Sequence, residues 1–394
     1  MSGSFNDNCR LPNRIEEARR APEKGPAILF FSGGTALRQL SRELIHYSHN
    51  SIHVITTFDS GGSSAELRRA FGMPAVGDLR NRLLALADRS PSGNAEVRRL
   101  AAHRFDLHKE PRALQSELER LGAGRDPLMA DIPTPMRDEI SAYFERFRQL
   151  MPADFNLRGA SLGNLLITGA WLHFDRRIEP ALQAVSRLLK ARGTVLPILD
   201  AHLELAAELE DGTRLHNQRE LTGKETRSIA SPVKRVWLTG DTTTLEPAAT
   251  RISAELEERI AGADLVCYPM GSFYSSVVAN LLPGGVCRAV AAAPCPKVYI
   301  PNLGADPESL GMGLAGAVQR LLRYLELGLD PGSGPDRLLN FVLIDASRGA
   351  YPEPLGLEEL DSLGIRVVDA PLVTSSSAPL LDEKRLVEWL ISLC

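Results

Sequence analysis

The stretch AILFFSGGT, residues 27–35, decides the fold that we predict for this chain. Five apolar residues in a row are typical of a parallel strand that is buried on both faces. The run stops at a pair of glycines, and apolar residues at helical spacing follow at Leu37, Leu40 and Leu44. A second apolar run begins at Ile52. Strand, glycine turn, helix and strand in this order predict a parallel βαβ unit.

The same alternation continues through the rest of the chain. Further strands are predicted at 194–198, 233–238, 265–268, 298–300, 341–344 and 365–368. Helical patterns lie among them at 162–174, 178–190, 248–260, 273–282, 314–325 and 385–393. We therefore predict an α/β fold over residues 26–394: a Rossmann-like, doubly wound, mostly parallel sheet with helices on both faces. Residues 203–209 fit an edge strand or a helix, and their pattern leaves both open.

Two segments are expected to lie outside the sheet. Residues 90–155 are helical and charged in pattern and contain no convincing strand, so we predict a helical insertion that caps the carboxyl edge of the sheet. Residues 1–25 are polar and mixed in charge, and we expect a flexible N-terminal arm.

Composition excludes several classes of protein. The 394 residues are 44% hydrophobic and 24% charged, and 45 Lys and Arg against 49 Asp and Glu give a formal charge of −4. Such a balance predicts no attraction for nucleic acid or for an anionic membrane, and basic pairs such as Arg68-Arg69 and Arg98-Arg99 are expected to be solvated helix faces. No apolar run is long enough to span a membrane.

The cysteines and the N-terminal residues indicate the cellular compartment in which the protein is expected. Five cysteines without a CxxC pair fit a reducing compartment, and the first residues do not resemble a signal peptide. We expect a cytoplasmic protein. A homodimer is also expected, since α/β enzymes of this size commonly form one.

The residues that could bind a ligand lie at glycine-containing turns. Ligands of open α/β sheets bind at the carboxyl ends of the strands, where such turns are expected. The amides of Gly33, Gly34 and Thr35 would suit a phosphate, although this stretch matches no established phosphate-binding pattern and could be a tight turn alone. Asp78 could cap a helix, as could Ser63 or Ser64. The pair His46 and His49 lacks a third ligand, so a solvent-facing pair is favoured over zinc.

Taken in order, these stretches resemble the CofD family, which includes the phospholactate transferases of deazaflavin coenzyme synthesis, and its YvcK-type, gluconeogenesis-factor-like relatives. The resemblance runs through residues 27 to 320 and is carried by six motifs in register. They are Ser32–Thr35, Phe58–Ser64, Gly77–Asn81, Gly163–Leu166, Gly271–Leu282 and Lys297–Leu303.

The resemblance implies a nucleotide bound at the carboxyl edge of the sheet. In CofD itself, an alcohol on a deazaflavin attacks the β-phosphorus of a guanylylated phospholactate, GMP leaves, and magnesium is required. In the YvcK branch, the same site holds a nucleotide sugar for regulation.

The resemblance also implies roles for particular residues. Nucleotide and phosphate contacts are expected from Gly33, Gly34, Thr35, Asn164, Gly271 and Ser272. The acceptor is expected to contact Ser60, Gly61, Gly62, Asn81 and Tyr274. Asp59 and Asp78 are expected to bind Mg²⁺ or the attacking hydroxyl, and thus to be the catalytic pair.

One departure from the family pattern bears on function. Relatives place two adjacent acids before the double glycine, whereas here Ser60 follows Asp59, which reduces the negative charge available for magnesium. The leading interpretation is a CofD-like transferase that moves a phosphorylated small acid from a guanylyl-activated donor to an alcohol. The alternatives are a non-catalytic regulator that binds a UDP-sugar, and a scaffold that has lost its ligand.

Overall fold

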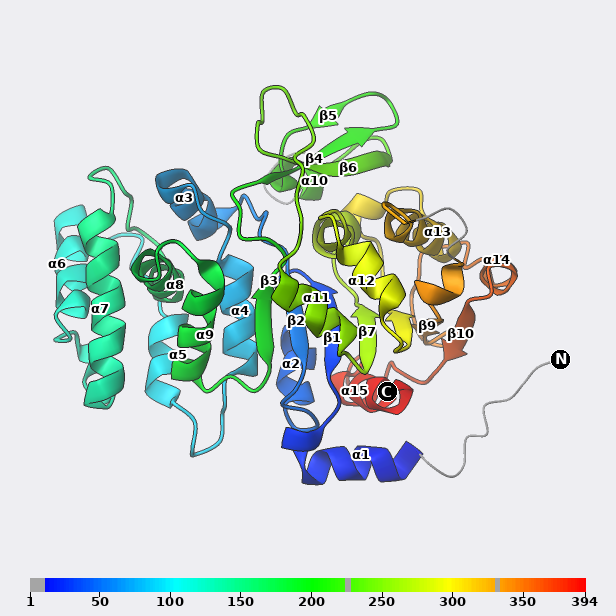
Figure 1. Cartoon of the computed structure of the whole chain (residues 1–394), viewed down its shortest axis with the longest axis horizontal. Coiled ribbons are helices and arrows are strands. Elements are labelled where there is room, and N and C mark those ends of the chain that lie inside the picture. The colour runs from blue at the N-terminus through cyan, green and yellow to red at the C-terminus, as the bar shows by residue number, and fades with distance from the viewer. Residues whose placement is uncertain (1–10, 224–227, 330–333) are drawn as a thin grey trace.

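The computed structural model describes residues 11–223, 228–329 and 334–394, and Figure 1 shows a sheet with helices on both faces. The sheet has seven strands in the order β10-β9-β8-β7-β1-β2-β3, and every neighbouring pair is parallel. The strands are β1 (Ile28–Ser32), β2 (Ile52–Ile55), β3 (Thr194–Pro197), β7 (Leu265–Tyr268), β8 (Lys297–Tyr299), β9 (Phe341–Ile344) and β10 (Arg366–Asp369). The predicted fold class is confirmed.

The double winding places a switch point beside β1. From β1 the chain adds β2 and β3 on one side, and it later returns to add β7, β8, β9 and β10 on the other. The loops after β1 and β7 therefore diverge, which opens a crevice at their carboxyl ends.

Strand β1 is buried on both faces, as its unbroken apolar run predicts. Ile28 and Phe30 belong to the core on one face, and Leu29 and Phe31 belong to the core on the other. This alternation follows from the two-residue period of a strand.

Helices from both halves of the chain cover the sheet. One face packs against α1 (Leu11–Arg20), α2 (Arg38–Leu44) and α15 (Glu383–Leu393). The other face packs against α11 (Ala254–Ala261), α12 (Val286–Ala292), α13 (Leu314–Leu325) and α14 (Leu357–Ser362). Of the arm predicted over residues 1–25, the structure describes residues 11–25: α1 contacts α15, and its Ala18 is buried. Residues 1–10 lie outside the described residues.

A layer of helices continues beyond β3 and has a core of its own. It comprises α3 (Gly62–Phe71), α4 (Gly77–Leu86), α5 (Ala95–Ala102), α6 (Pro111–Gly122), α7 (Thr134–Leu150), α8 (Leu162–His173) and α9 (Ile178–Leu189). Residues 90–155 are helical, as predicted, but α5 and α7 pack against α8 and α6 packs against α7, beside the sheet (Figure 1). They do not cover the carboxyl edge, because their apolar faces are buried against one another and α8.

A second, small sheet covers that edge instead. It has the order β5-β4-β6, is antiparallel, and is inserted between β3 and β7. Its elements are β4 (Glu204–Leu209), β5 (Arg214–Leu215) and β6 (Val233–Thr239), together with the short helix α10 (Gln218–Thr222). The ambiguous segment 203–209 is thus a strand, and residues 233–238 belong to this sheet rather than to the main one. Figure 1 shows the small sheet above the ends of β1 and β2.

The described residues also bear on the membrane prediction. None of the helices in these ranges combines the length and the apolar character needed to cross a bilayer.

The close approach of α7 to α8 generates a prediction about stability. A β-carbon added at Gly169 of α8 would lie 2.0 Å from the carbonyl oxygen of Tyr143 in α7. We expect Gly169→Ala to lower the free energy of unfolding by about 2 kcal/mol, since backbone must move to admit the methyl group. A shift of the urea midpoint at constant slope would measure this loss.

The control is Gly316→Ala in α13, where an added β-carbon would meet no atom within 4 Å. This variant should be stabilised by about 0.5–1 kcal/mol, because alanine favours the helix over glycine. Equal midpoints for the two variants would contradict the close packing of α7 against α8.

Candidate functional site

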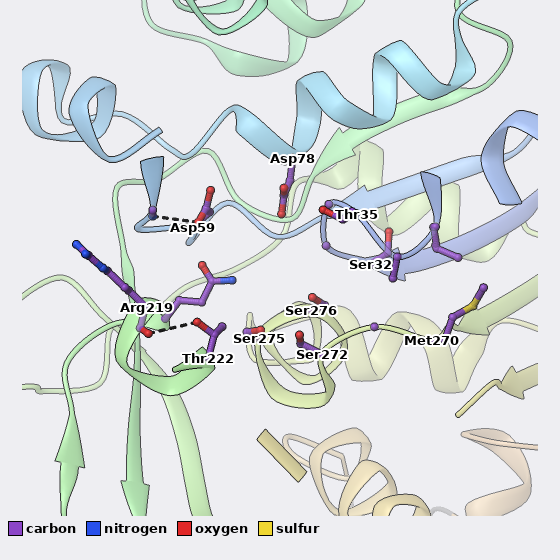
Figure 2. A pocket seen from close by; sticks show the side chains of 17 residues that line it. Ser32, Thr35, Asp59, Asp78, Arg219, Thr222, Met270, Ser272, Ser275 and Ser276 are labelled. Carbon is purple, nitrogen blue, oxygen red and sulfur yellow. Dashed lines mark hydrogen bonds between the residues drawn. The ribbon is translucent and has the colours of Figure 1, made fainter. Parts of the chain in front are cut away.

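A cavity of about 290 Å³ opens at the switch point, beyond the carboxyl ends of β1, β2 and β7. Its walls come from the turns after these three strands, from the start of α4 and from α10. The lining residues are Ser32, Gly33, Gly34, Thr35, Ala36, Leu37, Asp59, Gly61, Asp78, Gln218, Arg219, Thr222, Met270, Gly271, Ser272, Ser275 and Ser276. Figure 2 shows Asp59 and Asp78 on one side and Thr222 with Ser272, Ser275 and Ser276 on the other.

The glycine turn after β1 is held by a buried arginine of α4. Arg82 is completely buried, and its Nη2 donates to the carbonyl oxygens of Gly33 (3.1 Å) and Gly34 (3.4 Å). Its Nη1 donates to the carbonyl oxygen of Leu37 at 2.9 Å. In a trans peptide the N–H points opposite to the preceding C=O, so the amides of Gly34 and Thr35 point away from Arg82.

Arg82 also supplies charge behind the turn. Burial lowers its pKa to about 10, while the nearby Asp78 carboxylate opposes the shift, so the guanidinium stays protonated near neutral pH. Helix α2 begins only at Arg38, three residues beyond Thr35. Positive potential at the turn therefore comes from Arg82 and the amides, because no helix begins directly at the turn.

A second buried arginine, Arg68 of α3, holds the turn after β2. It is 3% exposed, and its Nη1 donates to the carbonyl oxygens of Phe58 and Asp59. Its Nη2 donates to the carbonyl oxygen of Leu203 at 2.6 Å and pairs with Glu204 at 2.9 Å. The prediction of a solvated face was wrong for Arg68, because this side chain joins the β2 turn to the start of β4.

The two carboxylates expected to be catalytic both line the cavity. Asp59 Oδ1 accepts a hydrogen bond from the Gly61 amide at 3.1 Å. Asp78 lies in the first turn of α4, whose N-cap is Val76, so capping does not explain this residue. A β-carbon added at Gly34 would lie 1.9 Å from Asp78 Oδ1, which places this carboxylate directly against the glycine turn.

The turn after β7 offers side chains rather than backbone amides. The amide of Phe273 donates to Asp306 Oδ2 at 2.7 Å, and those of Tyr274 and Ser275 donate to Glu308 Oε2 at 2.9 and 2.8 Å. Glu308 is 1% exposed, and its burial, together with the Asp306 charge, raises its pKa to about 7. The protein's own carboxylates thus occupy the start of this helical turn.

Asn302 fixes the backbone of this turn as well. Its Oδ1 accepts from the Gly271 amide at 2.8 Å, and its Nδ2 donates back to the Gly271 carbonyl oxygen. Sequence reasoning quoted Asn302 within a motif but assigned it no role.

Helix α10 closes the cavity from the second sheet. Gln218, Arg219 and Thr222 face the turns of the main sheet, and the Arg219 amide donates to Ser60 Oγ at 3.1 Å. Sequence reasoning missed α10, since it lies about 180 residues from the glycine turn and carries no recognisable motif.

The structure brings most of the predicted site residues together. Those that line the cavity are Gly33, Gly34, Thr35, Asp59, Gly61, Asp78, Gly271 and Ser272. Five others lie outside its lining: Ser60, Gly62, Asn81, Asn164 and Tyr274.

The residues outside the lining have other partners. Tyr274 is 1% exposed and its hydroxyl donates to the Val233 carbonyl oxygen at 3.3 Å. Asn81 Oδ1 accepts from Arg80 at 2.7 Å. Asn164 Nδ2 donates to Ser63 Oγ at 3.4 Å, while its buried Oδ1 has no hydrogen-bond partner among the described residues.

Magnesium would have few protein ligands here. Across the described ranges, no group of three or more His, Cys, Asp or Glu residues is positioned to hold a metal ion. Magnesium often takes only one or two carboxylates together with phosphate oxygens. Asp59 and Asp78 therefore fit a magnesium ion that a bound phosphate helps to hold.

The chain is similar in sequence and in fold to known proteins. It is 30% identical over 363 residues to the gluconeogenesis factor of Bacillus subtilis, covering 89% of this chain and 92% of that protein. It is 28% identical to the gluconeogenesis factor of Halalkalibacterium halodurans over 77% of this chain and 74% of that protein. A crystal structure of a UPF0052-family protein from Bacillus halodurans superposes with a TM-score of 0.68 at 23% identity, covering 93% of this chain and 99% of that one.

The family model described as 2-phospho-L-lactate transferase CofD matches residues 28–373, which include both sheets and every residue that lines the cavity. The chain belongs to the CofD family.

Proposed function

We propose that this protein binds the diphosphate of a nucleotide-linked small molecule, of the nucleotide-sugar type, and acts as a regulator rather than as an enzyme. The observation that carries the proposal is the Gly33–Thr35 turn, with its carbonyl groups bound to the buried Arg82. Amides that point away from a buried cation form a fixed set of donors for an anion.

The size of the cavity supports a ligand that is held by its diphosphate. At about 290 Å³ it is near the lower end for small-molecule sites, which span about 300–1,000 Å³. The diphosphate would contact the glycine turn, and α10 would contact the groups attached to it.

Two observations favour regulation over turnover. Relatives that match nearly the whole chain are named gluconeogenesis factor. Ser60, which replaces an acid of the family pattern, accepts a hydrogen bond from α10, so this turn keeps a single carboxylate, Asp59, near the cavity.

The second candidate is the phospholactate-type transferase, and the pair Asp59 and Asp78 favours it. Both carboxylates line the cavity beside the glycine turn. They would hold Mg²⁺ together with the donor's phosphates, and the ion would neutralise charge that develops in transfer. One carboxylate would accept the proton of the attacking alcohol as its oxygen bonds to the β-phosphorus and the bond to GMP breaks.

Ligand screening separates the two candidates. We expect a UDP-hexose to stabilise the protein without magnesium, by about 2.7 kcal/mol at a free concentration of 100 Kd. Thermal unfolding with uridine and guanine nucleotides, each with and without Mg²⁺, measures this. Stabilisation by guanine nucleotides alone, and only with Mg²⁺, would instead support the transferase.

The glycine turn is tested by Gly34→Val. Its side chain would meet the Asp78 carboxylate and displace the turn, so we expect nucleotide binding to be lost while the protein stays folded. Calorimetric titration measures the affinity, and Gly316→Ala, remote from the cavity, is the matched control. If Gly34→Val binds nucleotide with wild-type affinity, the glycine turn is not part of the binding site.

The two carboxylates are tested by Asp59→Asn and Asp78→Asn, which keep shape and remove charge. A binding protein should retain or improve its magnesium-free affinity, because a carboxylate beside a diphosphate repels it. A transferase should instead lose magnesium-dependent turnover by at least about 100-fold in each variant. Affinity titrations and a GMP-release assay, run on the same preparations, distinguish these results.

A further inference from the structure

A buried carboxylate, Glu308, lies behind the wall that the β7 turn contributes to the cavity. It belongs to the short helix η5 (Pro307–Ser309), and its Oε2 accepts the amides of Tyr274 and Ser275 in the helical turn η3 (Phe273–Val277). Its Oε1 accepts from Ser275 Oγ at 2.5 Å. Because Ser275 lines the cavity, Glu308 lies directly behind the surface that a ligand would meet.

The surroundings of Glu308 oppose its negative charge. The residue is 1% exposed, and within the described ranges no Lys, Arg or His side chain forms an ion pair with it. Its amide donates to Asp306 Oδ1 at 3.1 Å, so a second carboxylate lies beside it. A carboxylate that is removed from water without a cation favours its protonated form.

The elements that pack most closely against η5 are η3 and α10. From η3 comes Tyr274, whose hydroxyl is neutral near pH 7 because burial raises its pKa. From α10 come Arg219 and Glu220, and neither is among the groups that shift the pKa of Glu308. Burial, followed by the Asp306 charge, raises this pKa to about 7, so both forms of Glu308 are populated near neutral pH.

Protonation of Glu308 changes one hydrogen bond and removes one charge. Because Oε2 accepts two amides, the proton of the neutral acid lies on Oε1. The bond to Ser275 Oγ then reverses, and the carboxyl group donates. The local packing can therefore be the same in both forms, while the negative charge behind the cavity wall is present only in one.

We propose that Glu308 couples the cavity to proton uptake: its carboxylate repels a diphosphate from the β7 wall, and a bound diphosphate favours its protonated form. This inference rests on the diphosphate binding proposed above. Like charges repel more strongly inside a protein than in water, because the effective dielectric constant is lower. Such coupling is reciprocal, so affinity for the diphosphate falls as the pH rises through neutrality. Glu308 touches no ligand and is a positioning residue, which directs the diphosphate toward the glycine turn.

Thermal unfolding of the free protein tests the titration of Glu308 without any ligand. Glu308→Gln imitates the neutral acid, since its amide oxygen can accept the two backbone amides while its nitrogen donates to Ser275. The pKa of Glu308 in the folded protein lies above the ordinary value of 4.5, so stability present below that pH is lost as the pH rises through about 7. We expect the melting temperature of Glu308→Gln to exceed that of wild type by an increasing margin from about pH 5 to about pH 8.

Calorimetric titration with UDP-glucose, without magnesium, tests the coupling. Both phosphates of this probe are esterified, so the probe itself does not titrate near neutral pH. At about pH 8 we expect Glu308→Gln to bind about 10-fold more tightly than wild type, and the two affinities to converge at about pH 5.5. Titrations in two buffers that differ in ionisation enthalpy should show proton uptake by wild type near neutral pH, and this uptake should disappear in Glu308→Gln.

The matched control is Glu326→Gln, which removes an exposed carboxylate outside the lining of the cavity. It should retain wild-type affinity and wild-type proton uptake.

Three results would overturn the coupling. The first is a melting temperature of Glu308→Gln below that of wild type at about pH 8, which would show that the ionised carboxylate stabilises η3. The second is equal affinity of wild type and Glu308→Gln across the pH range. The third is proton uptake that persists in Glu308→Gln but is lost in Asp59→Asn or Asp78→Asn, which would assign it to the cavity carboxylates.

Failure of the proposed function gives a different pattern. Wild type would then bind no UDP-glucose at any pH, and the coupling would be disproved together with the binding. The melting temperatures would still report the titration of Glu308. Binding of UDP-glucose without proton uptake would remove the coupling alone.

Discussion

The hydrogen bonds of the buried Arg82 guanidinium to the glycine turn are the constraint on which the site depends. One side chain of α4 binds the carbonyl oxygens of Gly33, Gly34 and Leu37, and so fixes the turn after β1 relative to two helices. Hydrogen bonds to a charged group contribute about 1.5–3 kcal/mol each, and loss of the guanidinium would leave several buried carbonyls unsatisfied. The turn is therefore rigid before any ligand arrives, which lowers the entropic cost of binding.

Arg68 repeats this arrangement on the neighbouring strand. It joins the turn after β2, which carries Asp59, to Leu203 and Glu204 at the start of the second sheet. Ser60 adds a hydrogen bond to α10 from the same turn. The small sheet is thereby held over the carboxyl edge by bonds from the main sheet's own loops, and its position defines how much of a ligand the cavity admits.

Two walls of the cavity present different polar groups to a ligand. The wall formed by the β1 and β2 turns and by the start of α4 combines outward amides, a buried cation and two carboxylates, an arrangement that suits phosphate alone or phosphate with a divalent cation. In the β7 turn, Asp306 and Glu308 already take backbone amides, and Glu308 also accepts from the Ser275 hydroxyl, so this wall presents the side chains of Ser272 and Ser276. A diphosphate is therefore expected to contact the first wall, and neutral polar groups are expected to contact the second.

The sequence by itself determined the order of the elements and the end of the sheet at which the site lies. The apolar run of β1 followed by Gly33 and Gly34 is a local signal, and so is the glycine turn that carries Asp59 after β2; parallel connections then bring the carboxyl ends of these strands to one edge. Asp78, in the first turn of α4, reaches this edge because of where α4 packs. Only the tertiary structure decided which side chains reach the cavity. Arg82 holds the glycine turn, and α10 lines the cavity, through contacts between residues far apart in the sequence. Tyr274 is excluded because it is buried and its hydroxyl donates to the Val233 carbonyl oxygen at the start of β6. The amphipathic helices of residues 90–155 bury their apolar faces against α8 and one another. The hydrophobic periodicity of a helix shows which face is apolar, but it does not show which other element that face packs against.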